Sequence, residues 1–326
     1  MKVATWNTFL APGMVDRPLR LPRVLSTLTQ LARDHKVDVL ALQELHGYRR
    51  GPLTTWWASW ASWAGRWVPP GLLRLVSERA VEIGAVLCSL LEGRCGARAD
   101  DVHAPYRDAV LAHCRTLGWV HQHVPLPSRA RAGTMDCGVV LLSSSPLEDC
   151  QYRVLQGDMV HTPGAVGARV GGVRVWAVHL LPRLPPTIWE YRAVRRLNAL
   201  CGIDTVKRAN DNLRQITECL AAEPTLVLGD TNAPVATVQS QWRATVLRLL
   251  SPDANTLCPS EPEAPLCIDQ VWGHRVSTHA AGRVLRGQTP LVESMGSDHA
   301  PVIVEVHALH EFSSTEQVHP TAKINQ

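Results

Sequence analysis

The chain has 326 residues, of which 45% are hydrophobic and 19% charged, so we expect one or two globular domains with a large buried core. A formal net charge of +4, without a long block of one sign, does not by itself indicate a nucleic-acid partner. The nine cysteines include no Cys-x-x-Cys pair, which favours buried small side chains in a reducing compartment over a zinc site. No apolar run reaches the roughly 18 residues of a membrane span, and we expect an intracellular protein without a signal peptide or transmembrane segment.

The opening of the chain predicts a strand, a helix and a second strand. Lys2 to Trp6 is typical of a strand, and Asn7 stands at its end. Leu19 to Arg33 carries apolar residues at helical spacing, and Val37 to Leu42 is a second apolar strand that runs into Glu44. This order of elements indicates a layered α/β fold.

The next segment, residues 48–104, differs from the rest of the chain in its tryptophan content. Five tryptophans fall within twelve positions, and their spacing places most of them along one helical side: Trp56, Trp57, Trp60, Trp63 and Trp67. Leu72 to Leu91 is a second, mostly apolar helix candidate. We favour a helical hairpin that packs on the body of the protein. The alternative is an exposed aromatic face for a lipid surface or a partner.

The middle of the chain alternates helices and strands. Pro105 to Leu117 predicts a helix, Gly118 to Val124 a strand, and residues 125–135 a basic loop that contains Arg129 and Arg131. Cys137 to Ser143 follows as a strand.

A hairpin and two helices complete this part. Residues 168–178 alternate around Gly171-Gly172, a hairpin signal, and the second strand ends at His179. Helices are expected at about residues 187–201 and 204–221.

The centre of the chain is a short apolar strand, Thr225 to Leu228, at which Gly229 lets the backbone turn. Asp230 and Asn232 follow, and side chains two positions apart leave a strand end on the same side. Such residues also end strands in ordinary turns. A functional role for these two residues is favoured over an ordinary turn because other strand ends carry similar polar residues.

Two later segments add to this set. Leu266 to Trp272 places Asp269 within a strand, and Ser297-Asp298-His299 precedes a final strand from Pro301 to Val306. The tail from about residue 310 is polar and expected to be disordered.

The polar residues at strand ends are rich in oxygen and include two histidines: Asn7, Glu44, His179, Asp230, Asn232, Asp269, Asp298 and His299. Oxygen ligands of this kind favour a hard cation, Mg²⁺ or Mn²⁺, over zinc. A metal together with His and Asp suits the attack of water on a phosphoester.

With these residues in place, the chain resembles the endonuclease/exonuclease/phosphatase superfamily of DNase I-like enzymes from Met1 to about Val306. The segments that carry the resemblance stand in the family's order: Thr5-Trp6-Asn7, Leu42-Gln43-Glu44, Gly138 to Ser143 with Pro146-Leu147, Val178-His179-Leu180, Gly229-Asp230-Thr231-Asn232, Ile268-Asp269, and Gly296-Ser297-Asp298-His299-Ala300-Pro301. The resemblance implies a four-layer α/β/β/α sandwich of two mixed sheets. One domain would span residues 1–310, interrupted by the helical insert at 48–104 and followed by a tail at 311–326.

The resemblance also implies a role for each residue of the site. Metal ligands would be Glu44, Asn7 and Asp298, and Asp230 would orient or deprotonate the attacking water. Phosphate oxygens would be held by Asn232 and His179, or His179 would protonate the leaving group. His299 would contact the scissile phosphate, oriented by Asp269.

The substrate stays open among branches of the superfamily. Abasic-site endonucleases carry Tyr where this chain has His179, whereas His occurs there in pancreatic-type deoxyribonucleases, neutral-type sphingomyelinases, inositol polyphosphate phosphatases, deadenylases and tyrosyl-DNA phosphodiesterases. Gln270 departs from the aromatic residue or His of many members, which leaves the substrate open. We expect a nuclease or DNA-end phosphodiesterase, supported by Arg129 and Arg131. The alternatives are a lipid phosphodiesterase or inositol phosphate phosphatase, with lipid contact through Trp56 to Trp67, and, last, an inactive binding module.

Overall fold

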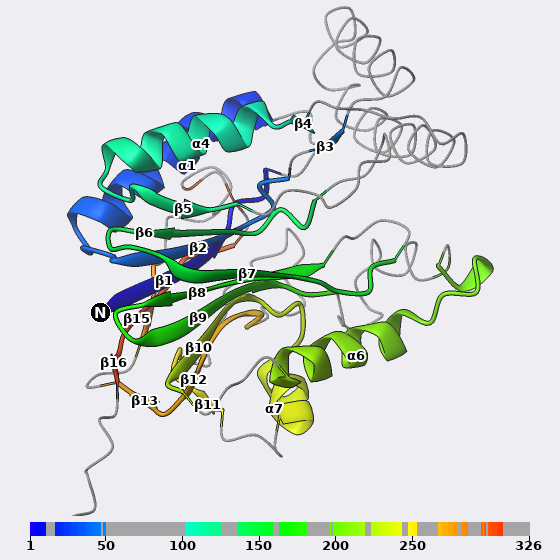
Figure 1. Cartoon of the computed structure of the whole chain (residues 1–326). Coiled ribbons are helices and arrows are strands. Elements are labelled where there is room, and N and C mark those ends of the chain that lie inside the picture. Colours follow the sequence, from blue (N-terminus) through cyan, green and yellow to red (C-terminus); the bar gives the residue numbers. More distant parts are fainter. Residues whose placement is uncertain are drawn as a thin grey trace, which may run out of the picture.

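Two six-stranded sheets packed face to face form the centre of the protein, as the computed structural model shows (Figure 1). The structure describes residues 1–10, 17–46, 48–49, 102–124, 136–158, 163–181, 196, 198–218, 223–242, 247–252, 267–278, 282–285, 295, 297 and 299–308. Within those ranges, every helix is too short or too polar to cross a membrane.

The first sheet has the strand order β14-β15-β1-β2-β6-β5. Its strands are β14 (Arg283–Val284), β15 (Val302–Glu305), β1 (Lys2–Asn7), β2 (Val39–Gln43), β6 (Val140–Ser143) and β5 (His121–His123). The central pair β1 and β2 is parallel, and the other pairs are antiparallel, so the sheet is mixed.

The second sheet has the order β11-β12-β10-β9-β8-β7 and is also mixed. Its strands are β11 (Arg248–Leu249), β12 (Asp269–His274), β10 (Thr225–Asp230), β9 (Val173–His179), β8 (Gly164–Val170) and β7 (Glu148–Val154). Here β10 and β9 form the parallel pair. The predicted hairpin is confirmed as β8 and β9, which turn at Gly171-Gly172.

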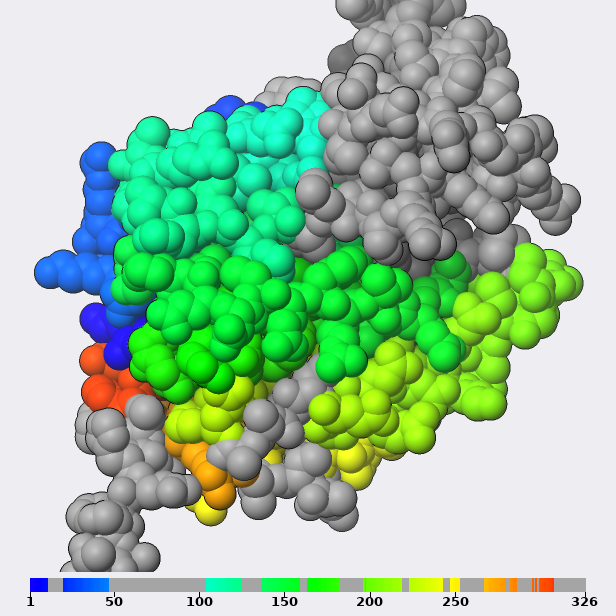
Figure 2. All heavy atoms as spheres, in the orientation of Figure 1, coloured from blue at the N-terminus to red at the C-terminus, as the bar shows by residue number. Residues whose placement is uncertain are grey.

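Helices cover the outer face of each sheet (Figure 1). On the first sheet lie α1 (Arg17–Arg33) and α4 (Pro105–Thr116), and on the second lie α6 (Thr205–Glu218) and α7 (Val235–Trp242). In Figure 2 the atoms of α4, of β7 to β9 and of α6 form consecutive bands, so side chains fill the space between the ribbons. The predicted four-layer α/β/β/α sandwich is confirmed.

Strand β2 shows why the central strands are continuously apolar. Leu40 and Leu42 pack in the cluster under α1 and α4, whereas Val39 and Ala41 pack in the cluster between the two sheets. Both faces of the strand are therefore buried, and each fully buried aliphatic side chain contributes about 1.5–3 kcal/mol relative to exposure. Strand β10 divides its residues in the same way between the sheet interface and the layer of α6 and α7.

Strand register brings the polar strand ends to one edge of the sandwich. In the parallel pairs, Asn7 is level with Gln43, and Asp230 is level with His179. In the antiparallel pair β10–β12, Asp230 is opposite Asp269, which is the first residue of its strand. Glu44 follows Gln43 directly, so residues distant in sequence meet at this edge.

The turn expected at Gly229 is absent, and that prediction is wrong. Gly229 lies inside β10, level with Val178 and Gln270, and the strand continues to Asp230. A Cβ at position 229 would lie 2.0 Å from the carbonyl oxygen of Val178. The glycine therefore serves close approach of neighbouring strands rather than a change of direction.

Several predictions concern segments of which the structure describes little. The two ends of the 48–104 segment pair as a short antiparallel ribbon, β3 (Tyr48–Arg49) with β4 (Val102–His103). The five tryptophans, the helix at Leu72 to Leu91, the loop with Arg129 and Arg131, most of the helix at 187–201 and the tail at 311–326 lie outside the described residues. A last ribbon joins β13 (Val276–Ser277) to β16 (His307–Ala308).

Candidate functional site

Asn7 links the two sheets at the site. Its Nδ2 donates hydrogen bonds to Oε1 of Glu44 and to Oδ2 of Asp230, both at 3.0 Å. Its Oδ1 accepts a hydrogen bond from the backbone N–H of Phe9 at 3.0 Å, which fixes the orientation of the amide. The side chain of Asn7 thus holds two carboxylates from different sheets near one another.

Glu44 adopts a left-handed backbone conformation with φ of 60°, uncommon for a residue other than glycine. The next residue, Leu45, is buried, and its N–H donates to the carbonyl oxygen of Gly138 at 2.9 Å. This anchoring maintains the strained conformation. The Oε2 atom of Glu44 is buried and has no hydrogen-bond partner among the described residues. A buried carboxylate oxygen without a donor fits a cation ligand.

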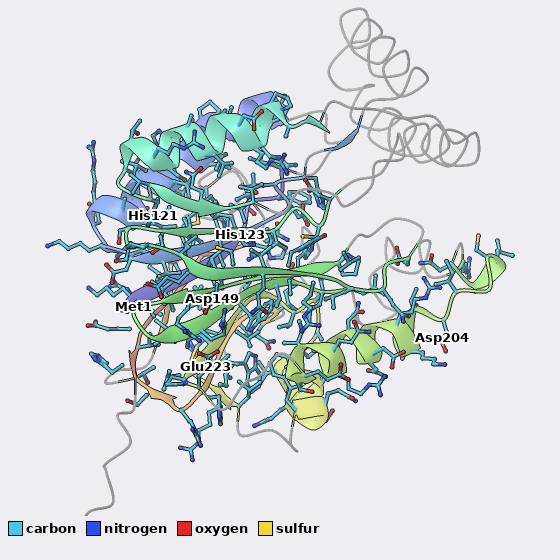
Figure 3. All side chains as sticks on the ribbon, in the orientation of Figure 1. Met1, His121, His123, Asp149, Asp204 and Glu223 are labelled. Carbon is cyan, nitrogen blue, oxygen red and sulfur yellow. The ribbon has the colours of Figure 1, made fainter. Side chains whose placement is uncertain are left out.

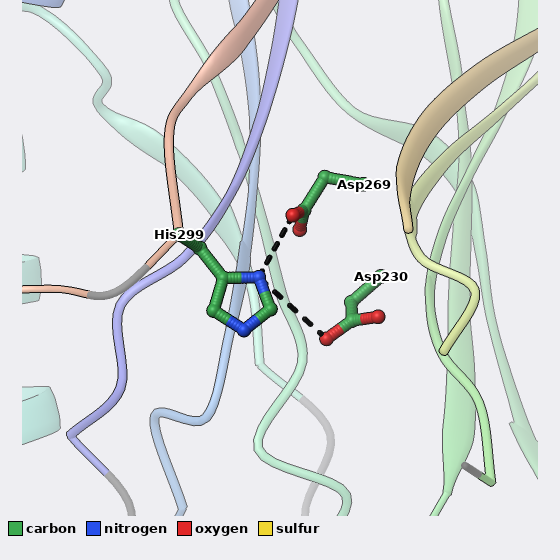
Figure 4. Close-up of side chains that lie close together, drawn as sticks. All are labelled: Asp230, Asp269 and His299. Atoms are coloured by element: carbon green, nitrogen blue, oxygen red, sulfur yellow. Dashed lines mark hydrogen bonds and ion pairs between the residues drawn. The ribbon is translucent and has the colours of Figure 1, made fainter. Parts of the chain in front are cut away.

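Asp230, Asp269 and His299 form a buried cluster at the facing strand ends (Figure 4). The Nδ1 atom of His299 lies 2.7 Å from Oδ2 of Asp269 and 4.0 Å from Oδ2 of Asp230. A carboxylate only accepts hydrogen bonds, so in the neutral ring Nδ1 of His299 carries the proton.

The backbone of His299 is held by residues of the same edge. Ser297 Oγ donates to the carbonyl oxygen of Asn7 at 2.7 Å and accepts from the N–H of His299 at 3.1 Å. The indole N–H of Trp6 donates to the carbonyl oxygen of His299 at 3.0 Å. These bonds tie the segment before β15 to the end of β1.

Burial raises the pKa of Asp230 to about 7, and the charge of nearby Asp269 acts in the same direction. His299, the amide of Asn7 and the backbone N–H of Asn232 oppose this rise. A carboxyl with a pKa near neutrality suits general base catalysis at physiological pH.

His179 and Asn232 complete the arrangement around Asp230. The Nε2 atom of His179 lies 4.0 Å from Oδ2 of Asp230, and the backbone N–H of Asn232 donates to Oδ1 at 2.7 Å. Asn232 has φ of 49°, and its Nδ2 donates one hydrogen to the carbonyl oxygen of Leu180 at 3.0 Å. A side-chain amide carries two Nδ2 hydrogens, so the bond to Leu180 uses one of two donors.

The structure thus brings together seven of the eight residues expected at the site: Asn7, Glu44, His179, Asp230, Asn232, Asp269 and His299. Asp298 lies outside the described residues. Two groups could hold a cation, namely Glu44 with Asn7, and the cluster of Asp230, Asp269 and His299, whose ligand atoms lie within 4.8 Å of one another. The chemical role of each residue stays a prediction.

Gln270 is a structural residue of the second sheet. Its Nε2 donates to the carbonyl oxygens of Ala233 at 2.9 Å and Cys267 at 2.8 Å, and its Oε1 accepts from the indole of Trp272 at 2.9 Å. These bonds tie β12 to the turn before α7. They account for glutamine at this position without a contact to substrate.

One neighbour of the site was missed from the sequence. The ring of His46 lies beside that of His179, with centroids 6.3 Å apart. The only signal in the sequence is its place two residues after Glu44, where side chains of an extended segment share a side.

The model of the Endonuclease/Exonuclease/phosphatase family matches residues 4–299. Among solved structures, an endonuclease/exonuclease/phosphatase family protein from Leptotrichia buccalis is similar with a TM-score of 0.56 and 12% identity, over 94% of this chain and 99% of that one. A beta toxin mutant from Staphylococcus aureus with bound magnesium ions has a TM-score of 0.56 and 13% identity, over 93% of this chain and 98% of that one. Sphingomyelinase C from Streptomyces griseocarneus has a TM-score of 0.52 and 16% identity, over 93% and 98%.

No curated protein sequence matches the chain. At these identities the solved structures show a common fold, whereas the family match extends over most of the sequence. The protein belongs to the endonuclease/exonuclease/phosphatase family, a group of metal-dependent phosphoester hydrolases.

Proposed function

We propose that the protein is a Mg²⁺-dependent phosphodiesterase of nucleic acid in which Asp230 activates the attacking water. The observation that supports this most is the setting of Asp230. Its carboxylate is buried, accepts hydrogen bonds from Asn7 and Asn232, and lies 4.0 Å from both histidines of the site. A base held by donors on one side and flanked by imidazoles on the other suits transfer of a proton from water.

The other residues at the facing strand ends would bind the metal, bind the phosphate or protonate the leaving group. Glu44, with Asn7 and Asp298, would hold the metal, which when bound neutralises charge on the phosphate. In its imidazolium form His299 would donate a hydrogen bond from Nε2 to a phosphate oxygen, because Asp269 occupies Nδ1. Asn232 would donate its second amide hydrogen to a phosphate oxygen, and His179 would do the same or protonate the leaving group.

Nucleic acid is favoured by the basic residues of the chain. Only four of the 33 basic residues are lysine, and the arginine fork suits bidentate binding of phosphate. Arg129 and Arg131 of the basic loop would contact the backbone of the substrate. Binding of this kind weakens steeply with salt, because phosphate contacts release counterions.

A lipid phosphodiester is the second candidate substrate. It is supported by the tryptophans from Trp56 to Trp67, since aromatic side chains suit a lipid interface. The fold is also shared with sphingomyelinase C. This candidate predicts that vesicle binding depends on Trp56, Trp60 and Trp63 and hardly on salt.

A panel assay tests the proposal. Duplex and single-stranded DNA, RNA, tyrosyl-DNA, sphingomyelin and inositol phosphates are offered to the protein with Mg²⁺, Mn²⁺ or EDTA. We expect hydrolysis of a nucleic acid that requires the metal and is lost in Asp230→Asn, while Asp204→Asn, a change at the start of α6, retains it. Hydrolysis of sphingomyelin alone selects the second candidate, and an Asp230→Asn variant with full activity refutes the mechanism.

A further inference from the structure

His46 lies beside the site, and no step of the proposed reaction uses it. Leu45 separates it from Glu44 and is fixed by burial and by the hydrogen bond to Gly138. The rings of His46 and His179 are tilted by 55° at a centroid separation of 6.3 Å. An anchored leucine thus places Glu44 and His46 next to the same group of residues.

The ring of His46 is held in one tautomer. Its Nδ1 lies 2.8 Å from the backbone carbonyl oxygen of Asp136. A carbonyl oxygen accepts only, so Nδ1 carries a proton in either charge state of the ring. The other nitrogen, Nε2, has no hydrogen-bond partner among the described residues. In the neutral ring Nε2 is an acceptor.

The partner of Nδ1 is itself fixed by a buried ion pair. The carboxylate of Asp136 pairs with the guanidinium of Arg107 from the first turns of α4, and it accepts the N–H of Gly138 at 2.9 Å. The side chains of Arg107 and Asp136 are only 7% and 1% exposed. Burial of such a pair costs several kcal/mol per ion in desolvation, roughly, so it adds little net stability. Its evident effect is to place the Asp136 carbonyl.

The absence of a side chain at Gly138 provides the space that the imidazole of His46 occupies. A Cβ at this position would lie 2.8 Å from each of Cε1, Nδ1 and Nε2 of His46. The residue also has φ of 64°, a conformation that favours glycine. His46 is therefore held by Arg107 of α4 together with Asp136 and Gly138, which precede β6. Its second nitrogen, Nε2, makes no hydrogen bond to the part of the chain that the structure describes.

We propose that His46 is a specificity-determining residue, whose Nε2 accepts a hydrogen bond from a hydroxyl or N–H of the group esterified to the scissile phosphate. This inference rests on the proposed phosphodiesterase function. An acceptor is the complement of a sugar hydroxyl, a base N–H or the hydroxyl and amide of a sphingolipid. Nε2 can form no such hydrogen bond with an ester group that lacks a donor.

Two substitutions separate a substrate contact from a structural role. In His46→Asn the side-chain amide reaches the position of Nδ1 and keeps a donor for the Asp136 carbonyl, but nothing replaces Nε2. In His46→Gln an amide oxygen reaches the position of Nε2, while the donor to Asp136 is lost. His113→Asn is the matched control, because His113 bonds to Thr29 and Leu25 on the outer helices.

Steady-state kinetics use substrates with and without a donor. For the p-nitrophenyl ester of thymidine 5′-phosphate, or for sphingomyelin, His46→Asn should raise KM about tenfold with kcat nearly unchanged, the effect of one lost hydrogen bond. His46→Gln should recover part of this loss. For bis(p-nitrophenyl) phosphate, which has no donor, KM should not change. The substrate on which the effect appears identifies a nucleoside or a lipid source.

The contrary results are equally specific. Equal KM values for wild type and His46→Asn on every hydrolysed substrate would overturn the proposal. So would impairment in His46→Gln alone together with a lower Tm, since that pattern is the signature of the Asp136 hydrogen bond and not of Nε2.

An NMR measurement keeps the two proposals distinguishable if no substrate is hydrolysed. ¹⁵N spectra of the histidine side chains should show that the neutral ring of His46 carries its proton on Nδ1. Addition of thymidine 5′-monophosphate or phosphoethanolamine should shift the His46 Nε2 resonance in wild type, and ligand affinity should fall in His46→Asn but not in His113→Asn. Absence of any shift would refute the role of His46, whereas a shift without turnover would refute only the enzyme proposal.

Discussion

Nδ2 of Asn7 lies 3.0 Å from Oδ2 of Asp230, and this hydrogen bond joins the end of β1 in one sheet to the end of β10 in the other. The same amide group also bonds to Glu44. Asn7 is therefore the side chain through which the proposed base and the proposed metal ligand are held at a fixed separation.

Replacement of Asn7 by alanine should reduce both stability and activity. The carboxylates of Asp230 and Glu44 would each lose a buried donor, which should lower the free energy of unfolding by about 1–3 kcal/mol. Misplacement of the base should lower kcat about 100-fold. Chemical denaturation and steady-state assays measure the two effects, with Asn210→Ala on α6 as the control. Wild-type activity in Asn7→Ala would contradict the bridging role.

Glu44→Ala should nearly abolish turnover without loss of fold. Removal of the principal ligand forfeits several kcal/mol of charge stabilisation, about a thousandfold or more in rate. Among the described residues Oε2 has no hydrogen-bond partner, so the bond that Asn7 donates to Oε1 is the side-chain contact that the fold would lose there. Thermal unfolding with and without Mg²⁺ checks the assignment: the metal should raise the Tm of wild type and leave that of Glu44→Ala unchanged. An equal rise in both proteins would place the ion elsewhere.

Asp269→Asn should lower kcat about 100-fold while the site keeps its geometry. The amide retains the size of the carboxylate but no longer favours a proton on Nδ1 of His299. His299→Ala should be at least as damaging, and the double variant should be no worse than His299→Ala alone, because the two residues act as a unit. If the losses in the two single variants multiplied, the pairing at 2.7 Å would not be functional.

The metal-free protein should lose stability as pH rises from about 4 to 7. The pKa of Asp230 is about 7 in the folded state against an ordinary value of 3.8, so the folded state retains a proton that the unfolded state has released. The free energy of unfolding must then fall across this interval. Urea denaturation in EDTA at a series of pH values measures the decline, and Asp230→Asn should remove it. A decline of the same size in the variant would assign it to other groups.

The opposite pH dependence is expected for Glu223, which Figure 3 shows near Asp149 toward the Met1 end of the sandwich. Partial burial by itself raises the pKa of Glu223, but hydrogen bonds and charges of Arg174 and Arg169 outweigh it and lower the pKa. The stability from these contacts is present above the unfolded-state pKa and is lost as pH falls through the lower, folded-state pKa.

Comparison with Glu223→Gln tests this sign. Wild type should be the more stable protein at neutral pH, and the difference should vanish once the pH has fallen below the lowered, folded-state pKa of Glu223. Glu148→Gln, an exposed change of equal charge on β7, is the control. A difference between wild type and Glu223→Gln that persists at low pH would indicate packing and not charge.

The sequence alone determined the layers and most of the site. Strands with two buried faces are continuously apolar, so β1, β2 and β10 were recognisable from local pattern. A polar residue directly after such a strand interrupts the apolar pattern. For this reason Asn7, Glu44 and Asp230 could be identified from the sequence as candidate site residues. The order of these segments along the chain identified the family.

Tertiary structure decided what depends on register and on contacts between distant segments. Gly229 was expected to turn the chain, because a sequence cannot reveal that Val178 lies too close for a side chain. Asp269 meets His299 only because β12 starts opposite the end of β10. The contacts that hold His46 could not be predicted for the same reason. Its ring bonds to the carbonyl oxygen of Asp136, and the carboxylate of Asp136 pairs with Arg107. Neither contact produces a periodic pattern in the sequence.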